Sequence, residues 1–314
     1  MKDQAGTPLA PPVRALLRHF RAQRPLRGGS LLITIFGDSI APRGGAITLG
    51  SLIRLAAAFG LTERLVRTSV ARLAREGWVA ARRAGRHSEY RLTRSGAERF
   101  AAATRRIYGE NPRTWDAQWT LLLLPGPARR AAEVRRELKW LGFGQLTPSL
   151  FAHPSCTLQE ARESLHTVAG AAGALLLRSA SADPGVDREL AARGWDLGEL
   201  ARRYRRFLAR FAPVEALAAQ GMQPETAFVV RTLLIHEYRK IHLQDPLLPP
   251  ALLPQAWVGT AAYELCRRLY AQVFAGAEAY LSQSARQLRR PLPALSAAAE
   301  ARFGGVGTQA SRPG

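Results

Sequence analysis

The sequence has almost no cysteine. Cys156 and Cys266 are the only two in 314 residues, they lie far apart, and neither belongs to a CxxC motif. This count excludes a disulfide framework and a cysteine zinc site, and it fits a reducing compartment. No run of about 18 apolar residues occurs, and residues 1–12 contain no apolar segment of signal-peptide length. We therefore expect a soluble, cytoplasmic protein.

Acidic residues and lysine are also scarce. The chain has 24 Asp and Glu against 45 Lys and Arg, a net charge of +21, and its only lysines are Lys2, Lys139 and Lys240. Two thirds of this positive excess falls within residues 1–108. Arginine suits bidentate contacts with phosphate and guanine, but the codon usage of a GC-rich genome produces the same preference. The composition leaves both explanations open.

No pattern of catalytic or metal-binding residues occurs. There is no P-loop, and the GFG run at 142–144 lacks the third glycine of a dinucleotide-binding motif. Four histidines show no metal-ligand spacing: His153, His166, His236 and His242. We therefore predict no catalytic residue, metal or cofactor, and a protein that is not an enzyme. The length and the 47% hydrophobic content instead predict two or three folded domains.

The most informative segment runs from residue 48 to residue 93. Thr48 suits the N-cap of a helix that ends at Gly60, and Thr62 suits the N-cap of a second helix that ends at Gly77. Two short helices joined by a tight turn are typical of a helix-turn-helix.

The second helix of this pair has a basic outer face. Its apolar residues recur at three- and four-residue spacing and must face a core: Leu65, Val66, Val70 and Leu73. The spacing turns another set outward: Arg64, Arg67, Thr68, Arg72 and Arg75. Such a face suits a recognition helix in the major groove of DNA. The alternative is a solvated basic surface without a partner.

An arginine-rich hairpin follows this helix. Residues 78–81 and 90–93 have the composition of strands, and the polar segment 82–89 between them contains a glycine. We predict a wing whose tip carries Arg82, Arg83, Arg86 and His87 and contacts backbone phosphate. The helix pair and the hairpin together predict a winged helix-turn-helix that binds double-stranded DNA.

The flanking segments predict further helices and strands. Helices are expected over 13–20, 31–38 and 95–108, although β-branched residues leave a strand possible at 31–38, and a linker is expected at 109–113. Strands at 115–125, 145–151 and 174–178 then alternate with helices at 128–141 and 157–169, which favours a ferredoxin-like α/β sandwich. Helices at 197–211, 226–243 and 257–283 surround a proline-rich elbow at 245–250.

These segments predict an α+β multidomain fold. We expect an N-terminal extension over 1–30, a winged helix-turn-helix DNA-binding domain over 31–108, a ferredoxin-like central domain over 115–190, a helical C-terminal domain over 195–300 and a disordered tail over 301–314.

Five short motif blocks occur in order along the chain: VRTSVARL with EGW (66–78), RHSEYRLT (86–93), WD with a following Trp (115–119), LGFG (141–144), and RTLLIHEYRK with DP and LLP (231–254). Their order resembles the PaaX family, the transcriptional repressors of bacterial phenylacetate catabolism, over residues 31–282. The resemblance implies a winged N-terminal domain, a central domain similar to the small CRISPR-adaptation nucleases and a helical C-terminal domain. It also implies a homodimer that an aryl-CoA thioester, usually phenylacetyl-CoA, releases from its operator.

The leading hypothesis is therefore a dimeric repressor of a phenylacetate catabolic operon. Two recognition helices about 34 Å apart would read a pseudo-palindrome. We expect base or near-base contacts from Arg67 and Arg72 and phosphate contacts from Arg64 and Arg75. The wing would contribute Arg82, Arg83 and Arg86. Which arginine meets which base stays open.

An aryl-CoA effector needs basic groups for its phosphates and an apolar slot for its ring. The candidate residues are Trp115, Trp119, Arg231, His236, Tyr238 and Arg239, and each of them also suits domain packing. A regulator of the same architecture that responds to another acyl-CoA, or to no ligand, stays open as an alternative.

A metal-dependent nuclease is a second alternative, because the central domain resembles a nuclease fold. Such chemistry needs carboxylates to hold a hard cation, and that fold places its acid after the first strand. Here the strand ends in the LPGP run at 124–127, which contains no acid. Asp116 precedes the strand and suits a cap or a turn. The sequence therefore disfavours catalysis.

Overall fold

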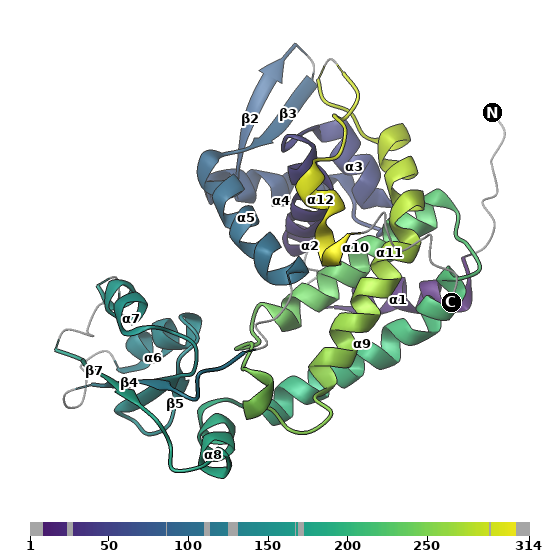
Figure 1. Ribbon diagram of the computed structural model, residues 1–314. Coiled ribbons are helices and arrows are strands. Elements are labelled where there is room, and N and C mark those ends of the chain that lie inside the picture. The colour runs from purple at the N-terminus through teal and green to yellow at the C-terminus, as the bar shows by residue number, and fades with distance from the viewer. Residues whose placement is uncertain are drawn as a thin grey trace. The chain divides into compact units, whose positions relative to one another are not determined.

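The computed structural model describes residues 9–23, 28–85, 87–109, 114–124, 131–166, 168, 173–288 and 290–305 (Figure 1). The chain forms two compact units. Unit 1 contains Met1–Glu110, Arg205–Leu243 and Ala261–Gly314, and unit 2 contains Asn111–Tyr204 and Gln244–Thr260. The segments 31–108 and 195–300, which the sequence suggested as separate domains, therefore share unit 1 for much of their length. The expected linker at 109–113 lies outside the described residues beyond Gly109.

Unit 1 begins with two helices. The helix α1 (Pro11–Ala22) buries Val13, Leu17 and Phe20, and α2 (Gly28–Ile35) continues through a π-helical turn, Phe36–Ile40, and a 3-10 turn, Ala41–Arg43. The helices predicted at 13–20 and 31–38 are thus confirmed, and the strand alternative for 31–38 is wrong.

The next two helices, α3 (Leu49–Ala57) and α4 (Glu63–Arg75), match the predicted helix pair. Thr48 Oγ1 accepts a hydrogen bond from the Ser51 amide and Thr62 Oγ1 accepts one from the Leu65 amide, each at 3.3 Å. Gly77 adopts a φ of +73°, a left-handed conformation that favours glycine after a helix. Local signals therefore define both ends of α4.

A three-stranded antiparallel sheet follows, in the order β1-β3-β2. The hairpin strands β2 (Val79–Ala84) and β3 (His87–Leu92) pair from Val79↔Leu92 to Ala84↔His87. The predicted loop at 82–89 is therefore wrong, because most of it is paired strand. The polar residues of this segment and their lack of hydrophobic alternation favour a loop, but backbone pairing between strands does not require such alternation. The short strand β1 (Ala46–Thr48) pairs with β3 and gave no signal in the sequence.

Helices close unit 1. The helix α5 (Arg94–Tyr108) confirms the prediction at 95–108. The helices α9 (Leu197–Ala218), α10 (Pro224–His242) and α11 (Val258–Ser284) confirm the three predicted in the C-terminal third, and α9 and α11 also contribute residues to unit 2. Most of α10 is buried, and it packs against α1 and α2 (Figure 1). Segments far apart in the sequence thus share one core.

The end of unit 1 corrects the predicted disordered tail. A short helix α12 (Ala297–Glu300) leads into a 3-10 turn, Arg302–Gly304. Phe303 is buried, with its ring edge-on to Tyr108 and Tyr270 at centroid distances of 5.1 and 5.3 Å. Residues 301–305 are therefore not disordered, and residues 306–314 lie outside the described residues.

Unit 2 contains a four-stranded antiparallel sheet in the order β5-β6-β4-β7. Its elements are β4 (Trp119–Leu123), α6 (Ala131–Trp140), β5 (Gly144–Gln145), β6 (Leu150–His153), α7 (Leu158–Leu165) and β7 (Leu175–Ser179). This β-α-β-β-α-β order is that of a split βαβ unit. The single strand predicted at 145–151 is wrong, because Leu146 N donates to Leu150 O at 2.9 Å and closes a turn between β5 and β6.

Both faces of this sheet are partly covered. On one face, Leu122 and Phe151 pack with Val134 and Leu138 of α6. On the other, Trp119 packs with α8 (Pro184–Gly194) and the 3-10 turn Pro250–Leu252. The segment Gln244–Thr260 thus belongs to unit 2 although it lies between two helices of unit 1 in the sequence.

Candidate nucleic-acid interface

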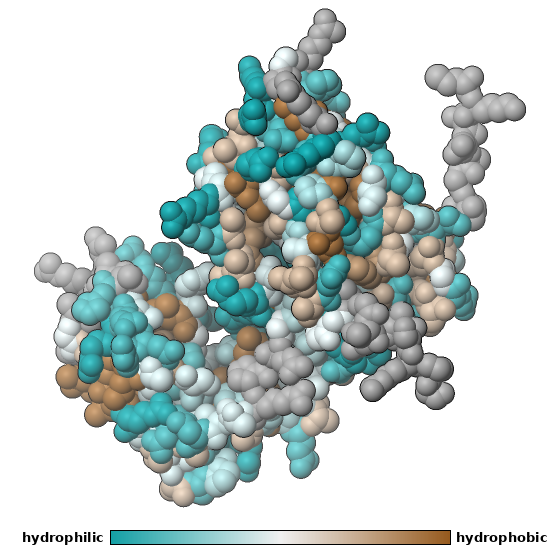
Figure 2. All heavy atoms as spheres, turned by 45° about the horizontal axis from the view of Figure 1, so that its top comes forward, coloured by the Kyte–Doolittle hydropathy of each residue, from teal (hydrophilic) through white to brown (hydrophobic). Residues whose placement is uncertain are grey.

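The outer face of α4 carries the predicted basic residues. Val66, Val70 and Leu73 are at most 1% exposed, whereas a polar set is exposed: Arg64, Arg67, Thr68, Arg72 and Arg75. Figure 2 shows hydrophilic side chains around the hairpin end of unit 1. The amphipathic spacing read from the sequence is therefore confirmed.

The arginines of α4 fall into two electrostatic classes. Arg67 forms an ion pair with Glu63 at 2.6 Å, and Arg72 lies 3.6 Å from Glu76. In contrast, the side chains of Arg64 and Arg75 have no hydrogen-bond or ion-pair partner among the described residues. Exposed ion pairs contribute only about 0–1 kcal/mol, so phosphate or a base edge can replace these glutamates at little cost.

The N-terminal end of α2 packs closely against α4. A Cβ on Gly28 would lie 3.1 Å from Leu65 Cγ, and one on Gly29 would clash with Arg72 Nη2. Glycine at position 28 lets the backbone of α2 approach α4 closely. The Arg72 guanidinium lies beside Gly29 as well as near Glu76.

The hairpin adds further cations. Arg82 and Arg83 are exposed on β2, and neither side chain has a partner among the residues that the structure describes. They lie on a paired strand and not in a loop. His87 is exposed on β3, and Arg86, the remaining wing candidate, lies outside the described residues.

A segment that the sequence did not single out supports the hairpin. The buried Glu89 carboxylate of β3 accepts a hydrogen bond from the Leu288 amide at 2.9 Å. Arg286 pairs with β1 and α3 through its backbone, because Thr48 N donates to Arg286 O and Arg286 N donates to Ser51 Oγ, each at 3.0 Å. Its side chain is exposed beside the sheet. Because only long-range contacts place Arg286 beside the sheet, no local sequence pattern predicts its position.

A buried ionic cluster anchors α2 to the C-terminal helices. Asp38 Oδ2 lies 3.0 Å from Arg231 Nε, and Asp38 Oδ1 lies 3.1 Å from Arg302 Nη1 and accepts hydrogen bonds from the Tyr108 and Tyr270 hydroxyls at 2.7 and 2.9 Å. Burial by itself would raise the pKa of Asp38, but the Arg231 and Arg302 guanidiniums hold it below its usual value. The carboxylate is therefore charged and fully paired.

The effector candidates of α10 lie in unit 1. Arg231, His236 and Tyr238 are at most 1% exposed, and His236 Nδ1 lies 3.0 Å from Thr34 Oγ1 of α2. Arg239 Nη2 donates to Ser30 O at 2.7 Å, and burial lowers the pKa of Arg239 to about 10, so it stays charged at neutral pH. These side chains contact α2 and the protein core in this conformation.

The other two effector candidates lie in unit 2. Trp119 is 1% exposed and donates from Nε1 to Asp187 Oδ1 at 2.7 Å. Trp115 is half-buried and donates to Pro154 O at 2.9 Å. None of the six candidates lines the cavity between α6 and the beginning of α9, or the smaller cavity bordered by Gly37, Phe100 and Arg302.

Asp116, the acid closest to the first strand of unit 2, has the surroundings of a turn residue. Its Oδ1 accepts a hydrogen bond from the Gln118 amide at 3.1 Å, and its Oδ2 pairs with Arg178 of β7. Among the described residues, no three His, Cys, Asp or Glu side chains gather closely enough to hold a metal ion. In the same part of the chain, no helix is long and apolar enough to cross a membrane.

Three family models match the chain in sequence. They describe a PaaX-like protein (residues 27–96), a PaaX protein central Cas2-like domain (112–191) and a PaaX-like protein C-terminal domain (195–283). The transcriptional repressor PaaX of Escherichia coli K12 is 40% identical over 290 residues, which cover 90% of this chain and 92% of the relative. The chain belongs to the PaaX family. The resemblance inferred from the five motif blocks is thus confirmed.

One solved structure is similar as well. The uncharacterized protein Rv0674 from Mycobacterium tuberculosis is 24% identical, and the match covers 72% of this chain and 89% of the other with a TM-score of 0.47. A score this low does not establish a shared fold. Membership of the PaaX family therefore depends on the sequence matches, which span all three parts of the chain.

Proposed function

We propose that this PaaX-family chain is a DNA-binding transcriptional repressor whose α3–α4 pair is a helix-turn-helix and whose β2–β3 hairpin is its wing. The observation that carries the proposal is the outer face of α4, where five polar or basic side chains project from a helix capped at both ends by local signals. Helices of this kind place side chains against base edges in the major groove. The hairpin would contact backbone phosphate.

The contacts can be assigned by the partners that each side chain has in the free protein. Among the described residues, the side chains of Arg64, Arg75, Arg82 and Arg83 have no partner to give up, which suits phosphate contacts that release counterions. Arg67 and Arg72, each oriented by a glutamate on its own helix, are the candidates for base or near-base contacts. Thr68 donates to Arg64 O at 2.9 Å and keeps its lone pairs for a contact with DNA.

Membership of the PaaX family supports a proposal for the regulated genes and for the effector. We propose a homodimer in the cytoplasm that binds a pseudo-palindromic operator, associates with the nucleoid there, and controls a phenylacetate catabolic operon. An aryl-CoA such as phenylacetyl-CoA would release it. A regulator that answers to another acyl-CoA, or to none, is the alternative. The protein has no proposed catalytic role, and no observation favours a nuclease.

An electrophoretic shift assay tests this function. Purified protein is titrated onto its own promoter fragment and onto random DNA of equal length, at several salt concentrations, with phenylacetyl-CoA, free phenylacetate or plain CoA added. The proposal predicts tighter binding to the promoter fragment and release by phenylacetyl-CoA alone. Equal affinity for both DNAs contradicts the repressor assignment, and release by phenylacetate contradicts the thioester assignment.

A further inference from the structure

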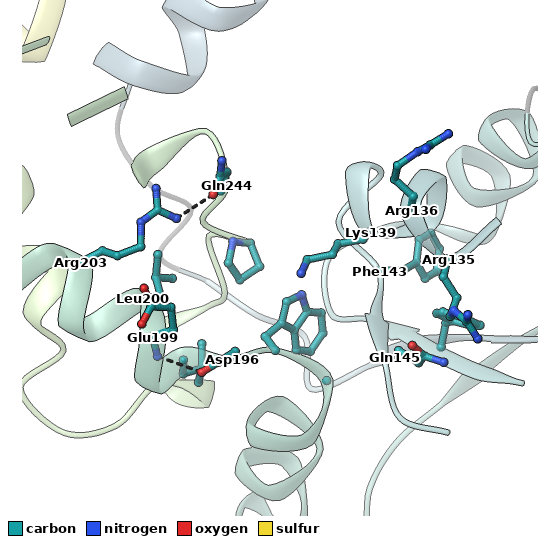
Figure 3. A pocket seen from close by; sticks show the side chains of 15 residues that line it. Arg135, Arg136, Lys139, Phe143, Gln145, Asp196, Glu199, Leu200, Arg203 and Gln244 are labelled. Carbon is teal, nitrogen blue, oxygen red and sulfur yellow. Dashed lines mark hydrogen bonds between the residues drawn. The ribbon is translucent and has the colours of Figure 1, made fainter. Parts of the chain in front are cut away.

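Unit 2 contains a cavity of about 660 Å³ that includes none of the proposed DNA-binding residues (Figure 3). One wall is the outer face of α6 with Arg135, Arg136 and Lys139, and the other is the beginning of α9 with Leu200 and Arg203. A volume of this size lies within the range of cavities that hold cofactors and drug-sized ligands, roughly 300–1,000 Å³. The cavity therefore has room for a small molecule.

The α6 wall of this cavity carries three cations without a partner. Among the described residues, the side chains of Arg135, Arg136 and Lys139 form no hydrogen bond and no ion pair. Figure 3 shows Lys139 pointing into the cavity, whereas Arg136 extends away from it at the rim. Three positive charges within five residues repel one another, so an anion placed between them would be stabilised.

The acidic residues of the cavity are already occupied. Asp196 Oδ1 accepts a hydrogen bond from the Glu199 amide at 2.8 Å and caps the first turn of α9. Glu199 pairs with Arg202 at 2.9 Å. The two carboxylates thus satisfy groups of their own helix and leave the cations of α6 unneutralised, which favours an anionic ligand.

Aromatic side chains form the inner surface. Trp195 is half-buried, and Phe143 and Phe151 are at most 2% exposed. A Cβ on Gly144 would lie 2.7 Å from Trp195 Cε2, so glycine at this position lets the indole pack directly on the β5 backbone. A flat indole beside three cations suits a ligand that combines an aromatic ring with phosphate.

We propose that this cavity is the effector site and that it holds a phosphate-bearing thioester of the coenzyme A class. Arg135 and Lys139 bind the phosphates, Arg136 contributes charge at the rim, and Trp195 packs against a ring of the ligand. The assignment rests on the proposed function for the identity of the effector, but the location comes from the cavity and its unpaired cations. It differs from the six residues expected from sequence, which line neither cavity.

The helix α9 connects the cavity in unit 2 with unit 1, so ligand binding in the cavity can affect unit 1 through this helix. Its first residues, Leu197 and Leu200, line the cavity, and the same helix continues without interruption to Ala218 in unit 1. A ligand that binds Arg203 as well as Lys139 would contact both walls. Binding would then alter the start of a helix that both units share.

Isothermal titration of the full-length protein with phenylacetyl-CoA, CoA and dephospho-CoA tests the site. The variant Arg135→Gln/Lys139→Gln removes both charges, and Arg162→Gln on α7, which removes an exposed cation outside the cavity, is the matched control. We expect the double variant to raise the Kd of phenylacetyl-CoA at least tenfold and the control to leave it unchanged. Dephospho-CoA should bind the wild type more weakly than CoA.

The shift assay on the same proteins separates this inference from the proposed function. The double variant should bind the operator normally without ligand, which also shows that it is folded, and should need at least tenfold more thioester for release. Unchanged thioester affinity in the double variant overturns the site, as does a wild type that binds no thioester. If the double variant loses operator binding but keeps its thioester affinity, the effector site is also wrong, and Arg135 and Lys139 contact DNA instead. If the thioester binds through these cations but no operator is shifted, the site stands and the repressor proposal fails.

Discussion

Arg231 and Asp38 form an ion pair of 3.0 Å in which each side chain is only 1% exposed. The pair joins α10 to the turn after α2, residues that are separated by almost two hundred positions in the sequence. Arg231 also pairs with Glu278 of α11 at 2.7 Å, and Arg302 donates to the same Asp38 carboxylate. The helix α4, which packs on α2, is therefore linked to the C-terminal helices through one buried charge.

Asp38→Asn should lower the free energy of unfolding by about 3–5 kcal/mol, because it removes the buried anion that Arg231 and Arg302 share and leaves Arg231 only its pair with Glu278. Urea denaturation of the full chain measures the effect. Asp116→Asn removes an exposed partner of Arg178 and should change the free energy of unfolding by at most about 1 kcal/mol. Equal losses in the two variants would contradict a structural role for the cluster.

The stability of unit 1 should depend on pH through His242. Burial lowers the pKa of His242 from 6.5 to about 4, while its ring contacts Tyr238 and the Arg106 carbonyl. The unfolded chain binds the proton first, so stability should fall as the pH drops from about 6.5 to 4, by roughly 3 kcal/mol in total. His242→Asn should flatten this part of the stability curve.

Tyr238→Phe is the control for that experiment, since it removes the same hydrogen bond but keeps the imidazole. Its unfolding free energy should keep the wild-type slope below pH 6.5. An identical slope in wild type, Tyr238→Phe and His242→Asn would show that the His242 imidazole is accessible to protons in the folded state.

Arg83→Ala should weaken binding to promoter and random DNA alike, because a phosphate contact carries no sequence information. The slope of log K against log salt concentration should become flatter by about one unit. Arg162→Ala, which removes an exposed cation of unit 2, serves as the reference. An unchanged slope for Arg83→Ala rules out a phosphate contact from the hairpin.

The sequence predicted the elements that local chemistry defines. Thr62, Gly77 and the spacing of Val66, Val70 and Leu73 fixed the ends and the buried face of α4, so the exposed arginines could be named in advance. The helices α5, α6 and α7 followed from similar patterns, whereas the division of residues 145–151 into β5 and β6 did not. Hydrophobic periodicity predicts which side chains are buried where a helix or strand packs one face on the core and exposes the other.

Long-range contacts determine what the sequence missed. The strand β1 exists because Ala46 and Thr48 pair with β3, and Phe303 is buried because Tyr108 and Tyr270 surround it. The cavity of unit 2 is lined by α6 and the start of α9, which lie some sixty residues apart in the sequence. The amphipathic pattern of α6 shows which residues face outward, but not that Arg135 and Lys139 line a cavity.

Base reading by α4 can be measured with the variant Arg67→Ala. Affinities for the promoter fragment and for random DNA are measured side by side at one salt concentration, with Arg94→Ala, an exposed cation of α5 paired with Glu98, as the control. We expect Arg67→Ala to lose about 1–3 kcal/mol of binding free energy on the promoter fragment and much less on random DNA. Equal losses on both DNAs would contradict base reading by Arg67.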